Sequence, residues 1–111
     1  TVTITVPSSG TIVVEANVWV LLDHTTGTSD QLVLNIGTSA TDGGDAYNNV
    51  YWTVPSAMPT YPQGNKTFTV RRHFTVTAGT YTYYLNGVMP TGASGNDEFW
   101  FANLQAVFYN N

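Results

Sequence analysis

The chain has 111 residues, a length that suits one domain with a single hydrophobic core. Charged residues make up only 9% of it and the formal net charge is −4, which excludes the basic surface that binds nucleic acid or anionic lipid. Cysteine is absent, which excludes disulfides and thiolate metal sites, and no apolar run is long enough to cross a membrane.

Polar and apolar residues alternate along the first half of the chain, the period-two pattern of half-buried strands. This pattern predicts strands over residues 1–6, 11–24 and 31–37. The segment 7–10 breaks the first strand, and Gly27 marks a hairpin turn between the second and third. The face expected to point inward carries Val2, Ile4, Val6, Ile12, Val14, Ala16, Val18, Val20, Leu22, Leu32, Leu34 and Ile36.

The second half continues the alternation, in strands over residues 47–54, 66–77, 80–89 and 98–109. A Pro-rich loop separates the first two of these, and Ala78-Gly79 predicts a tight turn that joins 66–77 to 80–89 as a hairpin. Roughly seven or eight strands without a helix predict an all-β sandwich, a single domain over residues 1–111. The inward face is expected to carry Phe68, Val70, Phe74, Val76, Tyr81, Tyr83, Leu85 and Met89.

Two strands are apolar on both faces. In the long second strand, Trp19 and Leu21 lie opposite the inward residues, and the last strand has large apolar side chains on either side. Each such side chain left in water would forgo about 1.5–3 kcal/mol of burial free energy, so we expect another copy of the chain, or a loop, to cover the second face. The residues expected at such an oligomer interface are Trp19, Leu21, Phe99, Phe101, Val107 and Tyr109.

Three stretches carry a family resemblance: "GTIVVEANVWVLLDH", "TFTVRRHFTVTAGTYTYYLNG" and the final "FWFANLQAVFY". With them the chain resembles, over nearly its whole length, the C1q/tumour-necrosis-factor superfamily, and most of all its bacterial C1q-like heads. The resemblance implies a jelly-roll β-sandwich of about eight to ten antiparallel strands. It also implies a compact homotrimer joined through an apolar face, with a non-enzymatic, extracellular or cell-surface role in recognition, adhesion or assembly.

The stretch "LLDHTTGTSD" offers a carboxylate–histidine combination in Asp23, His24 and Asp30. Asp23 and His24 are neighbours in an extended segment, so their side chains point to opposite faces and cannot both reach one ion while the strand continues. A metal site would also need three or four converging ligands. We therefore expect these residues to bracket a turn.

Arg72 falls on the apolar face of its strand, in register with Val70 and Phe74. A buried guanidinium needs a partner, because an unpaired inward charge costs several kcal/mol. We expect either a buried ion pair with Glu15 or Glu98, or a strand bulge that turns Arg72 towards solvent.

Two acidic loops, residues 42–45 and 96–98, contain oxygen ligands of the kind that calcium prefers, but the full EF-hand pattern is absent. We expect solvated loops, no metal and no other cofactor. No carboxylate pair and no nucleophile-elbow spacing stands out either, so we expect no catalytic residues and no enzyme.

Aromatic residues in and near loops, namely Tyr47, Tyr51 and Tyr61, are candidates to stack on sugar rings, whereas alternation places Trp52 inward. Asn65 begins an N-glycosylation sequon, which is used only where the host glycosylates and the side chain is exposed.

The leading hypothesis is an extracellular homotrimeric head, in which three weak sites give avidity for a glycan or protein ligand. The first alternative is a monomeric carbohydrate-binding module that uses the loop aromatics. The second is a surface-fibre subunit in which the N-terminal strand "TVTITV" completes a neighbour's sheet. We expect neither a nucleic-acid partner nor membrane insertion.

Overall fold

The computed structural model describes residues 1–41 and 48–111, with the side chains of residues 62, 63 and 101 left aside. The described residues form seven strands and no helix, as the alternation predicts. The family resemblance implies about eight to ten strands, which is more than the described residues form. The strands are β1 (Val2–Val6), β2 (Gly10–His24), β3 (Asp30–Gly37), β4 (Val50–Val54), β5 (Tyr61–Val76), β6 (Gly79–Thr91) and β7 (Glu98–Asn110).

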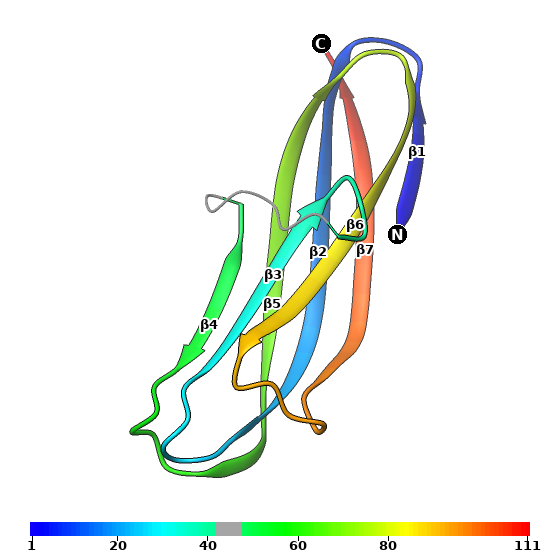
Figure 1. Ribbon diagram of the computed structural model, residues 1–111. Coiled ribbons are helices and arrows are strands. Elements are labelled where there is room, and N and C mark those ends of the chain that lie inside the picture. Colours follow the sequence, from blue (N-terminus) through cyan, green and yellow to red (C-terminus); the bar gives the residue numbers. More distant parts are fainter. Residues whose placement is uncertain (42–47) are drawn as a thin grey trace.

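The strands form two antiparallel sheets that pack as a β-sandwich (Figure 1). One sheet has the order β1-β6-β3-β4, and the other has the order β5-β2-β7. Among the seven strands of the described residues, β3 and β4 alone are consecutive and pair with each other; the other connections pass from one sheet to the other. Successive strands therefore alternate between the two layers, and each long strand pairs with strands that are distant in sequence.

The core lies between the inner faces that the alternation predicts. The even-numbered side chains of β2 from Ile12 to Leu22 are buried, and so are Leu32, Leu34 and Ile36 on the facing strand β3. Tyr83 is buried too, and its ring lies 4.3 Å from that of Phe74, between centroids, across the sandwich. Period-two alternation thus identifies the core because each strand turns one face to the opposite sheet.

Two predicted hairpins are wrong. The segments 66–77 and 80–89 do not pair with each other, because β5 pairs with β2 while β6 pairs with β1 and β3. The turn around Gly27, whose φ is 102°, likewise connects β2 to β3 in the other sheet. Both connections are arches rather than hairpins: each of the joined strands turns an apolar face towards the core, and two such faces meet only when the strands lie in opposite layers.

The sandwich is long and open along one side. Its dimensions are 52 × 24 × 19 Å, and its radius of gyration of 16.2 Å exceeds the about 13 Å expected for a compact domain of this size. On the side where β1 and β7 lie, β1 pairs only with the stretch of β6 from Gly79 to Tyr83 (Figure 1). The lower half of this side therefore lacks the cover that β1 gives the upper half.

A substitution at Gly10 can test the register between β2 and β7. It is buried and paired with Asn110, and a Cβ at this position would overlap the backbone carbonyl oxygen of Tyr109 and the ring of Phe108. We expect Gly10→Ala to lower the free energy of unfolding by about 1–3 kcal/mol in urea denaturation. Gly95→Ala is the matched control, since no atom lies within 4 Å of its added Cβ. Equal stability of the two variants would contradict the register.

Candidate functional site

The outer face of the β5-β2-β7 sheet carries the apolar side chains that the sequence leaves without cover. At one end Val13 lies opposite Val107, and Tyr109 lies next to them, opposite Thr11. At the other end the ring of Trp19 meets that of Trp100 edge to face, with the centroids 5.5 Å apart. We call this the β7 face; its apolar members are Val13, Trp19, Trp100, Val107 and Tyr109.

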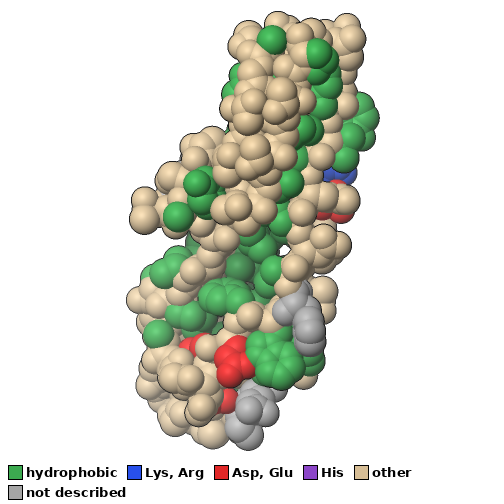
Figure 2. Space-filling model, turned by 90° about the vertical axis from the view of Figure 1, so that its right-hand side faces the viewer, with side chains coloured by type: hydrophobic (Ala, Val, Ile, Leu, Met, Phe, Trp, Pro, Cys, Tyr) green, Lys and Arg blue, Asp and Glu red, His purple; other side chains and the backbone are tan. Residues whose placement is uncertain are grey.

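Exposure on β7 is high for such large side chains. Trp100 is 41% exposed, Val107 44% and Tyr109 56%, while Trp19 is half-buried. The opposite face of the strand is incompletely covered as well, because Leu104, Ala106 and Phe108 are only partly buried. Figure 2, which views the molecule from the side of β1 and β7, shows hydrophobic side chains open to the surface in its lower half.

A register shift changes which aromatic residues share a face. Val18 pairs with Ala102 but Trp19 pairs with Trp100, so Phe101 is one extra residue on β7, as in a β-bulge. The shift brings Trp100 to the β7 face and turns Phe99 inward, where its ring lies against Gly87 of β6. Phe99 and Val107, which are predicted together at an interface, therefore lie on opposite faces of β7, and that part of the prediction is wrong.

The six residues predicted at an oligomer interface have different positions. Val107 and Tyr109 lie exposed on the β7 face, and Trp19 lies there half-buried. Leu21 is only 9% exposed, and Phe99 faces inward but remains 48% exposed. The side chain of Phe101 lies outside the described residues. Alternation missed Trp100, because a bulge leaves no period-two signal in the sequence.

Polar pairs occupy the middle of the β7 face. The Nε of Arg71 lies 3.8 Å from the Oε2 of Glu15, and the Thr69 hydroxyl donates a hydrogen bond of 2.8 Å to the Oδ1 of Asn17. Both Arg71 and Glu15 are substantially exposed, so their pairing contributes little to stability. This central polar belt separates the apolar end around Val107 from the one around Trp100.

Arg72 does not form the predicted pair with Glu15. It lies opposite Val14 on the inner face, whereas Glu15 lies on the outer face against Arg71. The Nη1 of Arg72 donates a hydrogen bond of 2.8 Å to the carbonyl oxygen of Ile36 in the other sheet, and the guanidinium lies 4.8 Å from the centroid of the Phe74 ring.

Glu98 is no candidate partner for Arg72 either, because it lies at the far end of the outer face, opposite Leu21. Its carboxylate accepts a hydrogen bond from the indole Nε1 of Trp100. Arg72 therefore links the two sheets through the carbonyl group of Ile36, while its guanidinium also lies against the Phe74 ring of its own strand. This arrangement fits a planar guanidinium, which can stack and donate hydrogen bonds at once.

His24 and Asp30 form a buried pair at the lower end of the sandwich. They are 1% and 2% exposed, and the Nδ1 of His24 is in direct contact with the Oδ2 of Asp30. The Nε2 of His24 lies 3.0 Å from the carbonyl oxygen of Met58, in the loop between β4 and β5. The two residues do bracket a turn, as predicted, but they also tie that turn to a second loop.

The partners of the imidazole define its chemistry. A carbonyl oxygen only accepts hydrogen bonds, so the Nε2 of His24 carries a proton. The contact of Nδ1 with the Oδ2 of Asp30 joins the ring to the carboxylate at its other end. Both ring nitrogens are occupied within the protein, so the pair is a structural clamp.

The position of His24 in the alternating pattern of β2 indicates that its side chain is buried and needs a partner. His24 follows Val20 and Leu22 in the inward register of β2, and an inward histidine needs a buried partner. Asp23, by contrast, points away from it, and its backbone N–H donates a hydrogen bond of 2.9 Å to the Oδ1 of Asp97.

In the loop before β7, the carboxylate of Asp97 stabilises a turn. The Oδ2 of Asp97 accepts a hydrogen bond of 2.6 Å from the backbone N–H of Ser94. In the described part of the chain, no three His, Asp or Glu side chains gather in the way that a metal ion requires. The other acidic loop, residues 42–45, lies outside the described residues.

The predicted loop aromatics separate in the structure. Tyr51 lies on the strand β4 rather than in a loop and is 49% exposed, whereas Tyr61 is half-buried, with its ring centroid 5.4 Å from that of His24. Trp52 points inward as predicted and packs against Phe68. Tyr47 lies outside the described residues. The exposed Asn65 lies opposite Leu21.

Comparison of the chain with models of protein families, with curated proteins and with solved structures finds no match. Within the described residues, no helix has the length and apolar character needed to span a bilayer. Function must therefore be argued from the surfaces of the molecule.

Removal of Asp30 should destabilise the fold. Asp30→Ala leaves the buried Nδ1 of His24 without its partner, and we expect a loss of about 1–3 kcal/mol in the free energy of unfolding. Thr28→Ala, in the same turn but exposed, should change the free energy by less than about 0.5 kcal/mol. Urea denaturation measures both variants, and an Asp30→Ala protein as stable as the parent would refute the clamp.

Tyr61 should make the fold sensitive to alkaline pH. Burial, and then the negative charge of Asp30, raise the pKa of the Tyr61 phenol above its ordinary value. The contribution of Tyr61 to the free energy of unfolding is therefore fully present below the unfolded pKa of about 10. It is lost as the pH rises through the folded pKa. The urea midpoint should fall above that pH, and Tyr61→Phe should reduce the fall. The pKa of Tyr83 is also raised, first by burial and then by Tyr81. The Tyr61→Phe variant should therefore still lose some stability at alkaline pH. Identical pH profiles for parent and variant would contradict this prediction.

Proposed function

We propose that this protein is a non-enzymatic recognition or structural module that assembles with copies of itself through the β7 face. The observation that carries the proposal is the exposure of large apolar side chains along β7, notably Trp100, Val107 and Tyr109. Covering each of them would gain up to about 1.5–3 kcal/mol of burial free energy. Exposed clusters of apolar side chains that polar residues border mark protein–protein interaction sites, and each end of the β7 face is such a cluster.

The edge of β7 supports the same proposal. In the described part of the chain β7 pairs only with β2, so its outer edge presents backbone groups to a neighbour. The strand has 13 residues and contains neither Lys nor Pro, two residues that natural proteins place on edge strands to prevent association. Only the bulge near Phe101 interrupts this edge.

A homotrimer is the assembly we favour. The resemblance to C1q/tumour-necrosis-factor jelly rolls implies three heads packed around one axis, and a closed ring prevents open-ended growth. The elongated shape suits such packing, because long subunits side by side bury their long edges. A surface of few charges, rich in Thr, Asn and Ser, supports an extracellular or cell-surface location.

The fibre hypothesis has less support. Val2, Ile4 and Val6 of β1 pack against the core of their own molecule, and β1 pairs with β6 of the same chain. Donation of this strand to a neighbour would first have to uncover these contacts. The association surface is therefore β7 rather than the N-terminal strand.

A charge placed on the β7 face should dissociate the assembly. We expect the parent chain to show about three times the 12.1 kDa of one subunit in multi-angle light scattering. Val107→Glu should shift the mass to that of one subunit, because a carboxylate would be buried without a partner in the interface. The change is mild for the isolated chain, since Val107 is exposed.

The matched control is Val88→Glu, the same change at a 56% exposed valine on the outer face of the other sheet. This variant should keep the parent mass. Circular dichroism confirms that both variants fold. A monomeric parent at high concentration, or an undiminished mass for Val107→Glu, would overturn the proposal.

A further inference from the structure

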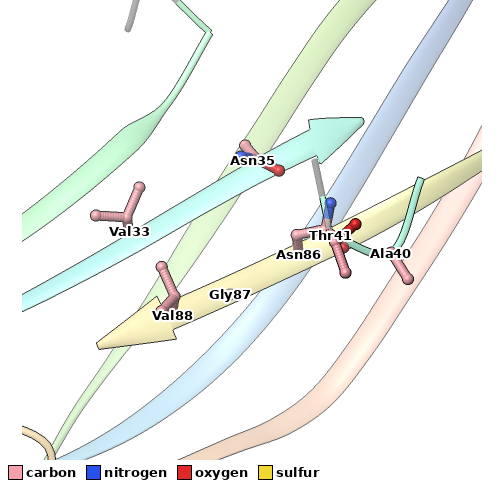
Figure 3. Close-up of a pocket in the computed structure, with 7 residues that line it drawn as sticks. All are labelled: Val33, Asn35, Ala40, Thr41, Asn86, Gly87 and Val88. Carbon is pink, nitrogen blue, oxygen red and sulfur yellow. The ribbon is translucent and has the colours of Figure 1, made fainter. Parts of the chain in front are cut away.

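A second surface, independent of the β7 face, lies on the outer side of the four-stranded sheet. There a shallow pocket of about 350 Å³ opens over β3 and β6, beside the segment that follows β3 (Figure 3). Its described lining residues carry no charge; they are Val33, Asn35, Ala40, Thr41, Asn86, Gly87 and Val88.

The register of the sheet arranges the side chains in two parallel rows. Val33 lies opposite both Tyr51 on β4 and Val88 on β6, which gives an apolar row across three strands. Next to it Asn35 lies opposite Asn86, which gives a row of amides. Directly opposed side chains have Cβ atoms about 4.5–5.5 Å apart, which joins the members of each row. The rows adjoin each other because Val33 and Asn35 are two residues apart on β3 and share its outer face.

The apolar row is open to solvent. Tyr51 is 49% exposed and Val88 56% exposed, although burial would favour both. The amide of Asn49 donates a hydrogen bond of 3.2 Å to the hydroxyl of Tyr51, which limits the rotation of the ring. The surface therefore offers a flat, oriented aromatic ring beside aliphatic side chains.

The amide row is fixed by the protein itself. The Nδ2 of Asn86 donates a hydrogen bond of 3.0 Å to the carbonyl oxygen of Ser39, and Asn35 is buried between its neighbours. An asparagine amide has two N–H donors and a carbonyl oxygen with two lone pairs. A bond that orients the group is thus compatible with hydrogen bonds to a ligand.

These features together select a ligand class. A neutral lining gives no attraction to phosphates, nucleic acids or acidic peptides. An aromatic ring with adjoining aliphatic groups suits the apolar C–H face of a pyranose, and amides suit its hydroxyl groups. We propose that the surface formed by Tyr51, Val33, Val88, Asn35 and Asn86 binds a neutral saccharide.

This inference rests on the proposed function, since it names the ligand that the recognition module would bind. The saccharide surface and the β7 face lie on different sheets, so association through β7 leaves Tyr51 and Val88 accessible. A trimer would then present three identical sites, and weak single contacts would combine into avidity for a polymer.

The test uses the parent protein with unbranched neutral hexaoses of glucose, xylose and mannose, each titrated separately and followed by NMR. We expect one hexaose to shift the side-chain amide signals of Asn35 and Asn86 and the ring signals of Tyr51. Tyr51→Ala and Asn86→Ala should each weaken binding about tenfold or more. Val88→Glu should weaken it too, while an acidic hexaose of galacturonate should not bind.

Thr82→Ala is the control, because this threonine lies on the same sheet but opposite Thr3 at its β1 end. Its affinity should equal that of the parent. Failure of all three neutral hexaoses to bind, preference for the acidic hexaose, or signal changes confined to other residues would overturn the saccharide site.

Val107→Glu separates the two proposals. It should keep the parent affinity for a soluble hexaose but bind an immobilised polysaccharide of the same sugar less tightly. A monomeric parent that binds the hexaose at Tyr51 would overturn the assembly and support the site. A trimeric parent that binds none of the hexaoses would support the assembly and overturn the site.

Discussion

A mismatch in strand length between the two layers determines the rest of the structure. In the β5-β2-β7 sheet the strands have 16, 15 and 13 residues, and at about 3.3 Å per residue β2 alone spans close to the full 52 Å of the molecule. The facing sheet has one strand of similar length, β6, while β1 and β4 have five residues each. Such a sheet buries the inner face of the central strand β2 but cannot cover β7 over its whole length. The partial exposure of Leu104, Ala106 and Phe108 on the inner side of β7 is therefore a consequence of topology. The exposure of the β7 face, which points away from the facing sheet, is a consequence of composition.

Much of the fold was predictable because alternation is a local property. Each inner face of β2, β3 and β5 depends only on the parity of residues within one strand, and a single buried layer enforces that parity. The hairpins were not predictable in this way, since a short turn such as Ala78-Gly79 connects two strands equally well within a sheet or across the sandwich. Pairing depends on distant residues, and alternation carries no information about them.

The residues whose positions differed from prediction mark places where one side chain depends on another element. Phe99 and Trp100 exchange faces because β7 carries one extra residue against β2. Arg72 bonds to a backbone carbonyl, a partner that has no sequence signature. Asp30 was placed correctly beside a turn, but its burial follows from the loop that brings Met58 to His24. In each case the missing information was tertiary rather than chemical.

The glycosylation sequon bears directly on the β7 face. Asn65 lies opposite Leu21, and Thr67 of the same sequon lies opposite Trp19, so both project from the outer face of the β5-β2-β7 sheet. A glycan on Asn65 would therefore occupy the end of the face that carries Trp19 and Trp100. Glycosylation and close packing of a second subunit exclude each other there, because a glycan is bulky and strongly hydrated. If the host glycosylates this site, association has to rely on the other apolar end, around Val107 and Tyr109; if it does not, the whole length of the β7 face is available to a neighbouring copy.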